Sequence, residues 1–151
     1  MHGVLIIPVM EEFIPQIAAI ERESFPAPRS EESLLDDLNN PRCVMIAAID
    51  NEKGAVLGWA GFTHMFDEAS VTNIAVKHGS RSHGIGTMLT RGLIARAEEL
   101  VMSTIILEVR ESNIIAKNIY TKLGFREIAV RKDFYSFPRE NGITMKKEII
   151  E

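Results

Sequence analysis

The sequence has one cysteine, Cys43, among 151 residues, so it cannot form an internal disulfide. This usage is typical of a reducing compartment, and the apolar run around Cys43 favours a small core residue over a nucleophile. The chain has no apolar run near the roughly twenty residues that a membrane-spanning helix needs. Residues 3–10 lack a basic leader, and two glutamates follow them. We therefore expect a cytoplasmic protein without membrane association.

Basic charge is also scarce, because the net charge is -4 at pH 7. This balance argues against general nucleic-acid binding and suits a basic protein or peptide partner. The histidines at 64 and 78 lack the spacing of metal ligands, so we expect no metal site. Apolar residues make up 46% of the chain, and the length is that of one domain with one core. The expected domain spans residues 1–151.

The hydrophobic pattern predicts a mixed sheet with helices on its faces. Strands are expected over residues 4–9, 43–50, 55–64, 69–76, 104–110, 125–137 and 142–148. Helices are expected over 11–24, from the cap Ser30 to Leu38, over 85–100, and from the cap Asn113 to Leu123. The order β-α-α-β-β-β-α-β-α-β-β indicates an antiparallel meander followed by a parallel crossover. The fold class is α/β, an α+β mixed sheet in three α/β/α layers.

A glycine turn joins the strand ending at Val76 to the long helix that begins at Ile85. The first N–H groups of a helix have no intrahelical partner and suit a phosphate. Gly84 and Gly86 have no Cβ, so an anion can approach the backbone, and Arg81 adds positive charge nearby. Such a turn also occurs as a plain helix start, so taken alone it leaves both interpretations open.

Two side chains after this turn could perform proton transfer. Period two in residues 104–110 puts Glu108 on one strand face with Arg110, which leaves either a structural salt bridge or a functional carboxylate. Tyr120 lies two helical turns after Asn113, where a core tyrosine is the ordinary interpretation. Together with the turn, the two supply an anion site, a base and an acid.

Four stretches of the chain together resemble the GCN5-related N-acetyltransferases, and most closely the bacterial RimI group. They are residues 73–76, 81–86, 107–113 and 120–125. The RimI group acetylates the N-terminal alanine of a small-subunit ribosomal protein. The resemblance implies an acetyl-CoA-dependent enzyme in which the acetyl group passes directly from thioester to amine, with no acyl-enzyme.

The resemblance also implies a role for each site residue. The pyrophosphate of acetyl-CoA would lie on the backbone of Arg81, Ser82, His83, Gly84, Ile85, Gly86 and Thr87. Pantetheine and thioester would lie beside Ile74, Ala75 and Val76, with a further contact from Asn113. Glu108 would be the general base and Tyr120 the general acid. Phe25 and Tyr135 would line the acceptor groove.

The chain departs from this pattern in places that leave the acceptor open. Ser82 and His78 replace a basic residue or glycine and a frequent proline, changes that can weaken acetyl-CoA binding. The segment 25–30 lacks the usual tryptophan. The expected acceptor is the N-terminal amine of a ribosomal protein. A lysine, polyamine or other small amine is the alternative, a non-catalytic acyl-CoA-binding module is a second, and monomer and homodimer both remain possible.

Overall fold

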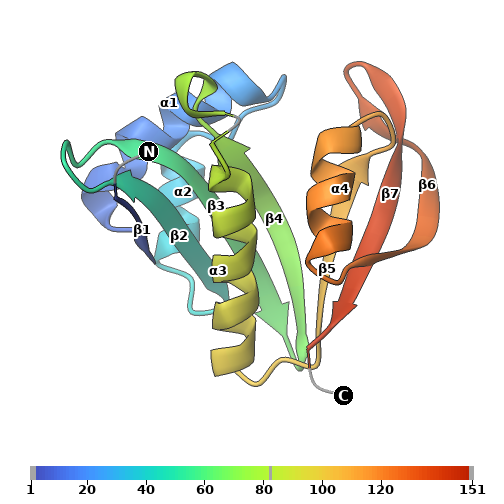
Figure 1. The fold of residues 1–151 in the computed structure, drawn as a ribbon. Coiled ribbons are helices and arrows are strands. Elements are labelled where there is room, and N and C mark those ends of the chain that lie inside the picture. Colours follow the sequence, from blue (N-terminus) through green and yellow to red (C-terminus); the bar gives the residue numbers. More distant parts are fainter. Residues whose placement is uncertain (1–2, 82, 150–151) are drawn as a thin grey trace.

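The fold is built around one seven-stranded mixed sheet with the strand order β1-β2-β3-β4-β5-β7-β6 (Figure 1). The computed structural model describes residues 3–81 and 83–149. The strands are β1 (Val4–Pro8), β2 (Cys43–Asp50), β3 (Val56–Met65), β4 (Glu68–Val76), β5 (Thr104–Arg110), β6 (Arg126–Ser136) and β7 (Arg139–Glu148). The predicted order of strands and helices and the mixed sheet are confirmed.

Four α-helices and two short 3-10 helices connect the strands. They are η1 (Glu11–Phe13), α1 (Ile14–Ser24), α2 (Glu31–Leu38), η2 (His78–Ser80), α3 (Ile85–Glu99) and α4 (Ile114–Lys122). The predicted caps are present, since Ser30 Oγ accepts from Ser33 N and Asn113 Oδ1 accepts from Ala116 N, each at 3.1 Å. Within the described residues, these helices include none long and apolar enough to cross a membrane.

The helices cover the two faces of the sheet and divide the core in two. On α3 the buried residues Ile85, Leu89, Leu93 and Ala97 recur every four positions and pack onto one face. The other face is covered by α1 and α2, which pack around Trp59. Figure 1 shows α3 and α4 on the near side of the sheet. The three-layer arrangement therefore follows from the amphipathic stripes of the helices.

One predicted helix differs in the type of its first turn and one predicted strand boundary is wrong, each for an identifiable reason. The first helix opens with the 3-10 turn η1, because Pro15 has no N–H to donate to Glu11 O. The last strand begins at Arg139 and not at 142, because Ser136 and Arg139 already pair across the final hairpin. Asn141, read from the sequence as part of the turn, accepts from Asp133 N at 3.0 Å inside the strand pair.

The sheet opens between its two central strands. β4 and β5 run parallel but pair only where residues 68–70 meet residues 104–106. An irregularity in the β3–β4 register leaves Thr72 as an extra residue on β4. Beyond it β4 and β5 diverge, as Figure 1 shows, and the rest of β4 has no partner on that side. The opening exposes a strand edge in the middle of the molecule.

Candidate active site

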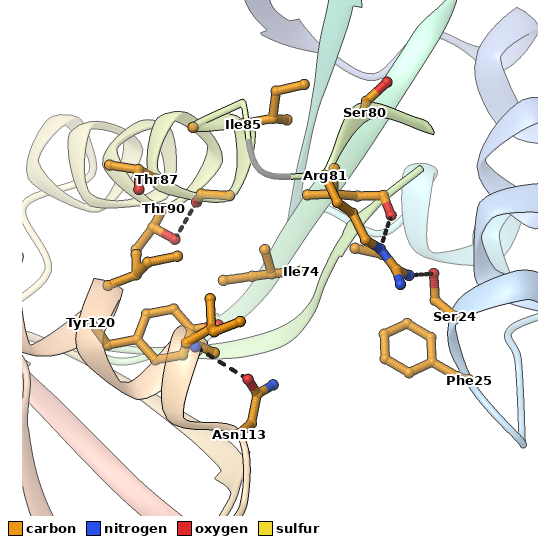
Figure 2. A pocket seen from close by; sticks show the side chains of 17 residues that line it. Ser24, Phe25, Ile74, Ser80, Arg81, Ile85, Thr87, Thr90, Asn113 and Tyr120 are labelled. Carbon is orange, nitrogen blue, oxygen red and sulfur yellow. Dashed lines mark hydrogen bonds between the residues drawn. The ribbon is translucent and has the colours of Figure 1, made fainter. Parts of the chain in front are cut away.

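A cleft of about 560 Å³ lies at this opening, bordered by the end of α1, β4, the start of α3, and α4 (Figure 2). Its size lies in the range of small-molecule sites. Most of the predicted site residues line it together: Phe25, Ile74, Ala75, Val76, Arg81, Gly84, Ile85, Gly86, Thr87, Asn113 and Tyr120. His83, Glu108 and Tyr135 do not line it. Ser82 lies outside the described residues.

The glycine turn presents free backbone donors to the cleft. Gly84 precedes α3 in the left-handed conformation, with φ of 77°, and provides no side-chain cap. The first intrahelical bond runs from Met88 N to Gly84 O at 3.0 Å. The N–H groups of residues 85–87 therefore have no intrahelical acceptor, and the positive end of the helix dipole adds to them. This geometry suits an anion.

Arg81 holds this turn in place with its side chain. Its Nε donates to Val76 O at 3.1 Å, and its Nη2 donates to Ser24 Oγ at 3.3 Å (Figure 2). The guanidinium thereby joins the end of β4 to the end of α1 across the cleft mouth. From the sequence, Arg81 was expected to add positive charge beside an anion. In the structure its side chain also links two segments of the chain. His83 is exposed near this turn.

The free edge of β4 turns backbone groups into the cleft. Antiparallel pairs alternate between hydrogen-bonded and non-bonded positions, and Lys77 N donates to Leu57 O at 2.8 Å. Counting back along the register, Ile74 and Val76 occupy the positions whose N–H and C=O point away from β3. Since β5 does not pair there, these groups face the opening. They can bind a carbonyl or amide lying along the strand.

Tyr120 projects from α4 into the same cleft, opposite the turn (Figure 2). Burial, with a smaller effect from the charge of Tyr135, raises the pKa of its phenol to about 12. The hydroxyl therefore keeps its proton at neutral pH. Within residues 3–81 and 83–149, its oxygen has no hydrogen-bond partner, so it remains available to a ligand.

Glu108 lies on β5, outside the lining of the cleft, and its side chain is 26% exposed. Its Oε2 accepts from Thr144 Oγ1 at 2.6 Å, and its Oε1 lies 3.5 Å from Arg131 Nη1. The suggested salt bridge with Arg110 is wrong, because Arg110 pairs with Glu140 at 3.3 Å. The pairing of β5 with β7, and the irregular pairing of β7 with β6, place Thr144 and Arg131 beside Glu108 and place Glu140 beside Arg110.

Tyr135 stands at the end of β6 beside Arg110, whose guanidinium carbon lies 4.3 Å from the ring centroid. Burial raises the pKa of Tyr135, although the charge of Arg110 opposes this and those of Glu108 and Glu140 add to it. These influences place Tyr135 among the charged groups of β5 and β7. Tyr135 lies outside the lining of the cleft, whereas Phe25 belongs to that lining (Figure 2).

The sequence interpretation missed Glu21, which is fully buried under the cleft. It accepts hydrogen bonds from Trp59 Nε1, Asn73 Nδ2 and Arg29 N at 3.0 to 3.2 Å. Burial raises the pKa of its carboxyl, and these donors partly offset the rise. The helical period carried the signal, because Glu21 follows Ile17 by four residues on the buried stripe of α1.

The titratable side chains do not gather into a metal site in the part of the chain that the structure describes. Among residues 3–81 and 83–149, no group of three or more histidine, cysteine or acidic side chains could hold an ion. Cys43 is half-buried at the start of β2 with a free thiol, and burial raises its pKa. Besides backbone N–H groups and the phenol of Tyr120, the cleft offers the polar side chains of Ser24, Ser80, Arg81, Thr87, Thr90 and Asn113.

Comparison with known proteins identifies the family to which the chain belongs. Residues 14–125 match the acetyltransferase (GNAT) family, so the chain belongs to that family and is an N-acetyltransferase. The relative described as [Ribosomal protein bS18]-alanine N-acetyltransferase from Haemophilus ducreyi is 31% identical over 140 residues, which cover 91% of this chain and 94% of the relative. The predicted resemblance is confirmed.

Solved structures share the fold over nearly the whole chain. The crystal structure of the ribosomal-protein-S18-alanine N-acetyltransferase from Escherichia coli has a TM-score of 0.89 and 29% identity, and covers 99% of this chain and 96% of its own. Arabidopsis thaliana NAA60 in complex with acetyl-CoA has a TM-score of 0.85 at 17% identity, and covers 97% of this chain and 99% of its own. At that identity, the plant protein shows the fold alone.

Proposed function

We propose that the chain transfers the acetyl group of acetyl-CoA to a protein N-terminal α-amine, with the N-terminal alanine of a ribosomal protein as acceptor. The observation that supports this best is the cleft itself. It combines the open N-terminus of α3, the free edge of β4 and the phenol of Tyr120. The relatives support the acceptor, since their names specify an alanine of ribosomal protein bS18.

The cleft suits the chemistry of the donor. The N–H groups of residues 85–87 match a pyrophosphate, and the edge at Ile74 and Val76 matches an extended amide chain. When bound, acetyl-CoA supplies an activated acetyl thioester. The N–H of Ile74 or Val76 would then stabilise negative charge that develops on a carbonyl oxygen beside the strand. Asn113, whose Oδ1 caps α4, keeps its Nδ2 for a ligand contact.

Two side chains would carry the protons. Glu108 takes the proton of the acceptor amine, directly or through a water, and Tyr120 donates to the departing thiolate. A protonated α-amine with a pKa of about 8 costs about 1.4 kcal/mol to deprotonate at pH 7, against about 4.6 kcal/mol for a lysine of pKa about 10.4. One carboxylate therefore suffices for an N-terminal acceptor, which favours it over lysine. Phe25 and Tyr135 wall the groove for that acceptor.

A peptide screen tests the acceptor. We expect CoA release with a peptide that begins with alanine, and none with the same peptide acetylated at its N-terminus. Polyamines and a blocked peptide with an internal lysine form the other arms of the screen. If CoA is released faster with a polyamine or with the blocked lysine peptide than with the alanine peptide, that amine is the acceptor in place of the N-terminal one. Acetyl-CoA binding without release in every arm would indicate a binding module, and the proposed function would be wrong.

A further inference from the structure

A second glutamate, Glu21, has contacts that the proposed reaction does not use. It lies near the C-terminal end of α1 with no exposed surface. Its Oε2 accepts from Trp59 Nε1 at 3.0 Å, and its Oε1 accepts from Arg29 N at 3.2 Å. Asn73 Nδ2 donates to both oxygens, at 3.1 and 3.2 Å. One carboxylate thus joins four segments of the chain.

The chemistry of these contacts requires a carboxylate. All three partners are N–H donors, so only a group with two acceptor oxygens and no hydrogen satisfies them together. The guanidinium of Arg29 bonds Ser33 and Asp37 on α2 and does not pair with Glu21. A buried carboxylate is costly to desolvate, and the charge of Arg29 is the weakest of the influences that offset this cost for Glu21. The buried position of Glu21 is therefore better explained by the segments that it holds together than by a contribution to core stability.

The donors lie at the two sides of the cleft. Arg29 ends the loop of residues 25–30, which begins with Phe25 on the cleft wall. Asn73 immediately precedes Ile74, the first residue of β4 that lines the cleft. Trp59 is a fixed point, since it is buried in β3. Glu21 therefore ties the loop of residues 25–30 to the strand edge against which the thioester would lie.

We propose that Glu21 is a positioning residue for the acceptor: it holds the loop of residues 25–30 in register with β4, so that Phe25 walls the acceptor groove. This inference rests on the proposed function. The other hydrogen bonds of the loop hold its two ends: Phe25 N donates to Glu21 O in α1, and Ser30 and Arg29 bond α2. Next to the loop, Arg81 donates to Ser24 at the end of α1. Without the carboxylate, the loop loses its link to the strand while the glycine turn keeps all of its contacts.

The substitution Glu21→Gln tests the role without changing the shape of the side chain. The amide nitrogen of glutamine faces at least one of the three donors, so one contact breaks. We expect the KM for the alanine peptide to rise about tenfold or more, the effect of losing a charge-assisted hydrogen bond. Acetyl-CoA affinity and kcat should change by less than about twofold, because the Glu21 side chain bonds Arg29, Trp59 and Asn73 and not the glycine turn or the proposed acid and base. Glu32→Gln, an exposed carboxylate on α2, is the control.

The KM distinguishes positioning from mere support of the fold. A structural defect lowers the fraction of folded enzyme, which lowers the apparent kcat and leaves KM unchanged. A released loop raises KM in enzyme that is fully folded by circular dichroism. If Glu21→Gln folds and has the wild-type KM, the inference is overturned.

A second pair of variants decides the question if Glu21→Gln fails to fold. Arg29→Pro and Arg29→Ala both remove the guanidinium, but only proline removes the N–H that bonds Glu21. We expect a higher peptide KM for Arg29→Pro than for Arg29→Ala, and equal values would overturn the inference. A wild-type protein that acetylates no amine overturns the proposed function and this inference with it. An active wild type with an unchanged Glu21→Gln overturns the inference alone.

Discussion

The two walls of the cleft are built by different means. The donor wall, residues 74–76 and 84–87, consists of backbone groups that a strand edge and a helix start leave unpaired. The proposed acceptor wall, residues 25–30 and the β6–β7 hairpin, is held by side chains that reach between segments distant in sequence, such as Arg110 to Glu140 and Asn73 to Glu21. In the proposed function, donor recognition would therefore depend on backbone groups, while acceptor recognition would depend on side-chain contacts.

The strongest test of this division is Glu108→Gln, on the acceptor side. A glutamine cannot accept a proton, so turnover at pH 7 should fall by about a hundredfold or more, the usual contribution of a general base. Acetyl-CoA affinity should stay unchanged, because Glu108 does not line the cleft. Steady-state kinetics with the alanine peptide and calorimetric titration of acetyl-CoA measure the two quantities.

Glu111→Gln is the control for Glu108, because it changes an exposed carboxylate just after the same strand. Glu108 also pairs with Arg131 and Thr144, so the unfolding midpoint of each variant must be measured as well. Turnover close to that of the wild type in Glu108→Gln would remove Glu108 from the mechanism. The acceptor side of the cleft would then supply no general base from Glu108.

Tyr120→Phe is expected to have the next largest effect. Losing the hydroxyl should lower kcat by about tenfold to a hundredfold, since a phenol of pKa about 12 is protonated and can donate at neutral pH. The only other tyrosine of the chain, Tyr135, gives the matched variant Tyr135→Phe, which should change the acceptor KM more than kcat. A Tyr120→Phe enzyme that differs from wild type only in acceptor KM would contradict the assignment.

Phenolate absorbance can test the environment of Tyr120 separately. In Tyr135→Phe the pKa of the remaining phenol should stay above the usual 10.0 because of burial, but below the wild-type value of about 12, because the charge of Tyr135 no longer adds to it. The folded pKa lies above the unfolded value of 10.0, so the folded protein keeps this proton when the unfolded chain has lost it. The contribution of Tyr120 to stability should therefore decline as the pH rises from about 10 to about 12.

The donor wall could be predicted from the sequence because its determinants are adjacent in the chain. Gly84 and Gly86 mark the helix start, and Asn113 marks the cap before Tyr120. What the sequence did not reveal is the opening of the sheet. The sequence of β4 does not indicate that its pairing with β5 ends at Ser70, since this depends on two strands that are far apart in sequence.

The acceptor wall was predicted less well because its contacts cannot be read from local patterns. Period two placed Glu108 and Arg110 on one strand face, and proximity suggested that they pair. In the structure the partners come from β6 and β7, because β5 is flanked by β7 and the β6–β7 register is irregular. Glu21 was passed over because a carboxylate in an amphipathic helix is ordinarily exposed.

A matched pair of glycine variants tests the donor wall, with smaller expected effects. Gly84→Ala should lower stability by about 1 to 2 kcal/mol, because Gly84 is left-handed although an added Cβ would meet nothing within 4 Å. Gly86→Ala should leave stability nearly unchanged, since its Cβ would lie 3.8 Å from Ile119 Cδ1, an ordinary contact. That methyl group would enter the cleft and weaken acetyl-CoA binding. Urea unfolding and calorimetric titration should therefore rank the two variants in opposite order.

The smallest effect is expected at Glu140, which fastens the β6–β7 hairpin to β5. Hydrogen bonding from Ser112, whose backbone N lies 2.6 Å away, lowers its pKa from the usual 4.5, and Arg110 adds to the effect. The unfolded chain takes up this proton first as the pH falls, so the stabilisation is present above about pH 4.5 and disappears below it. Glu140→Gln should therefore lower the free energy of unfolding near pH 7, and its difference from the wild type should shrink as the pH falls below 4.5. Glu127→Gln, an exposed carboxylate on β6, should show no such difference. A gap between wild type and Glu140→Gln that stays constant over this range would mean that packing, and not the charge on Glu140, holds the hairpin.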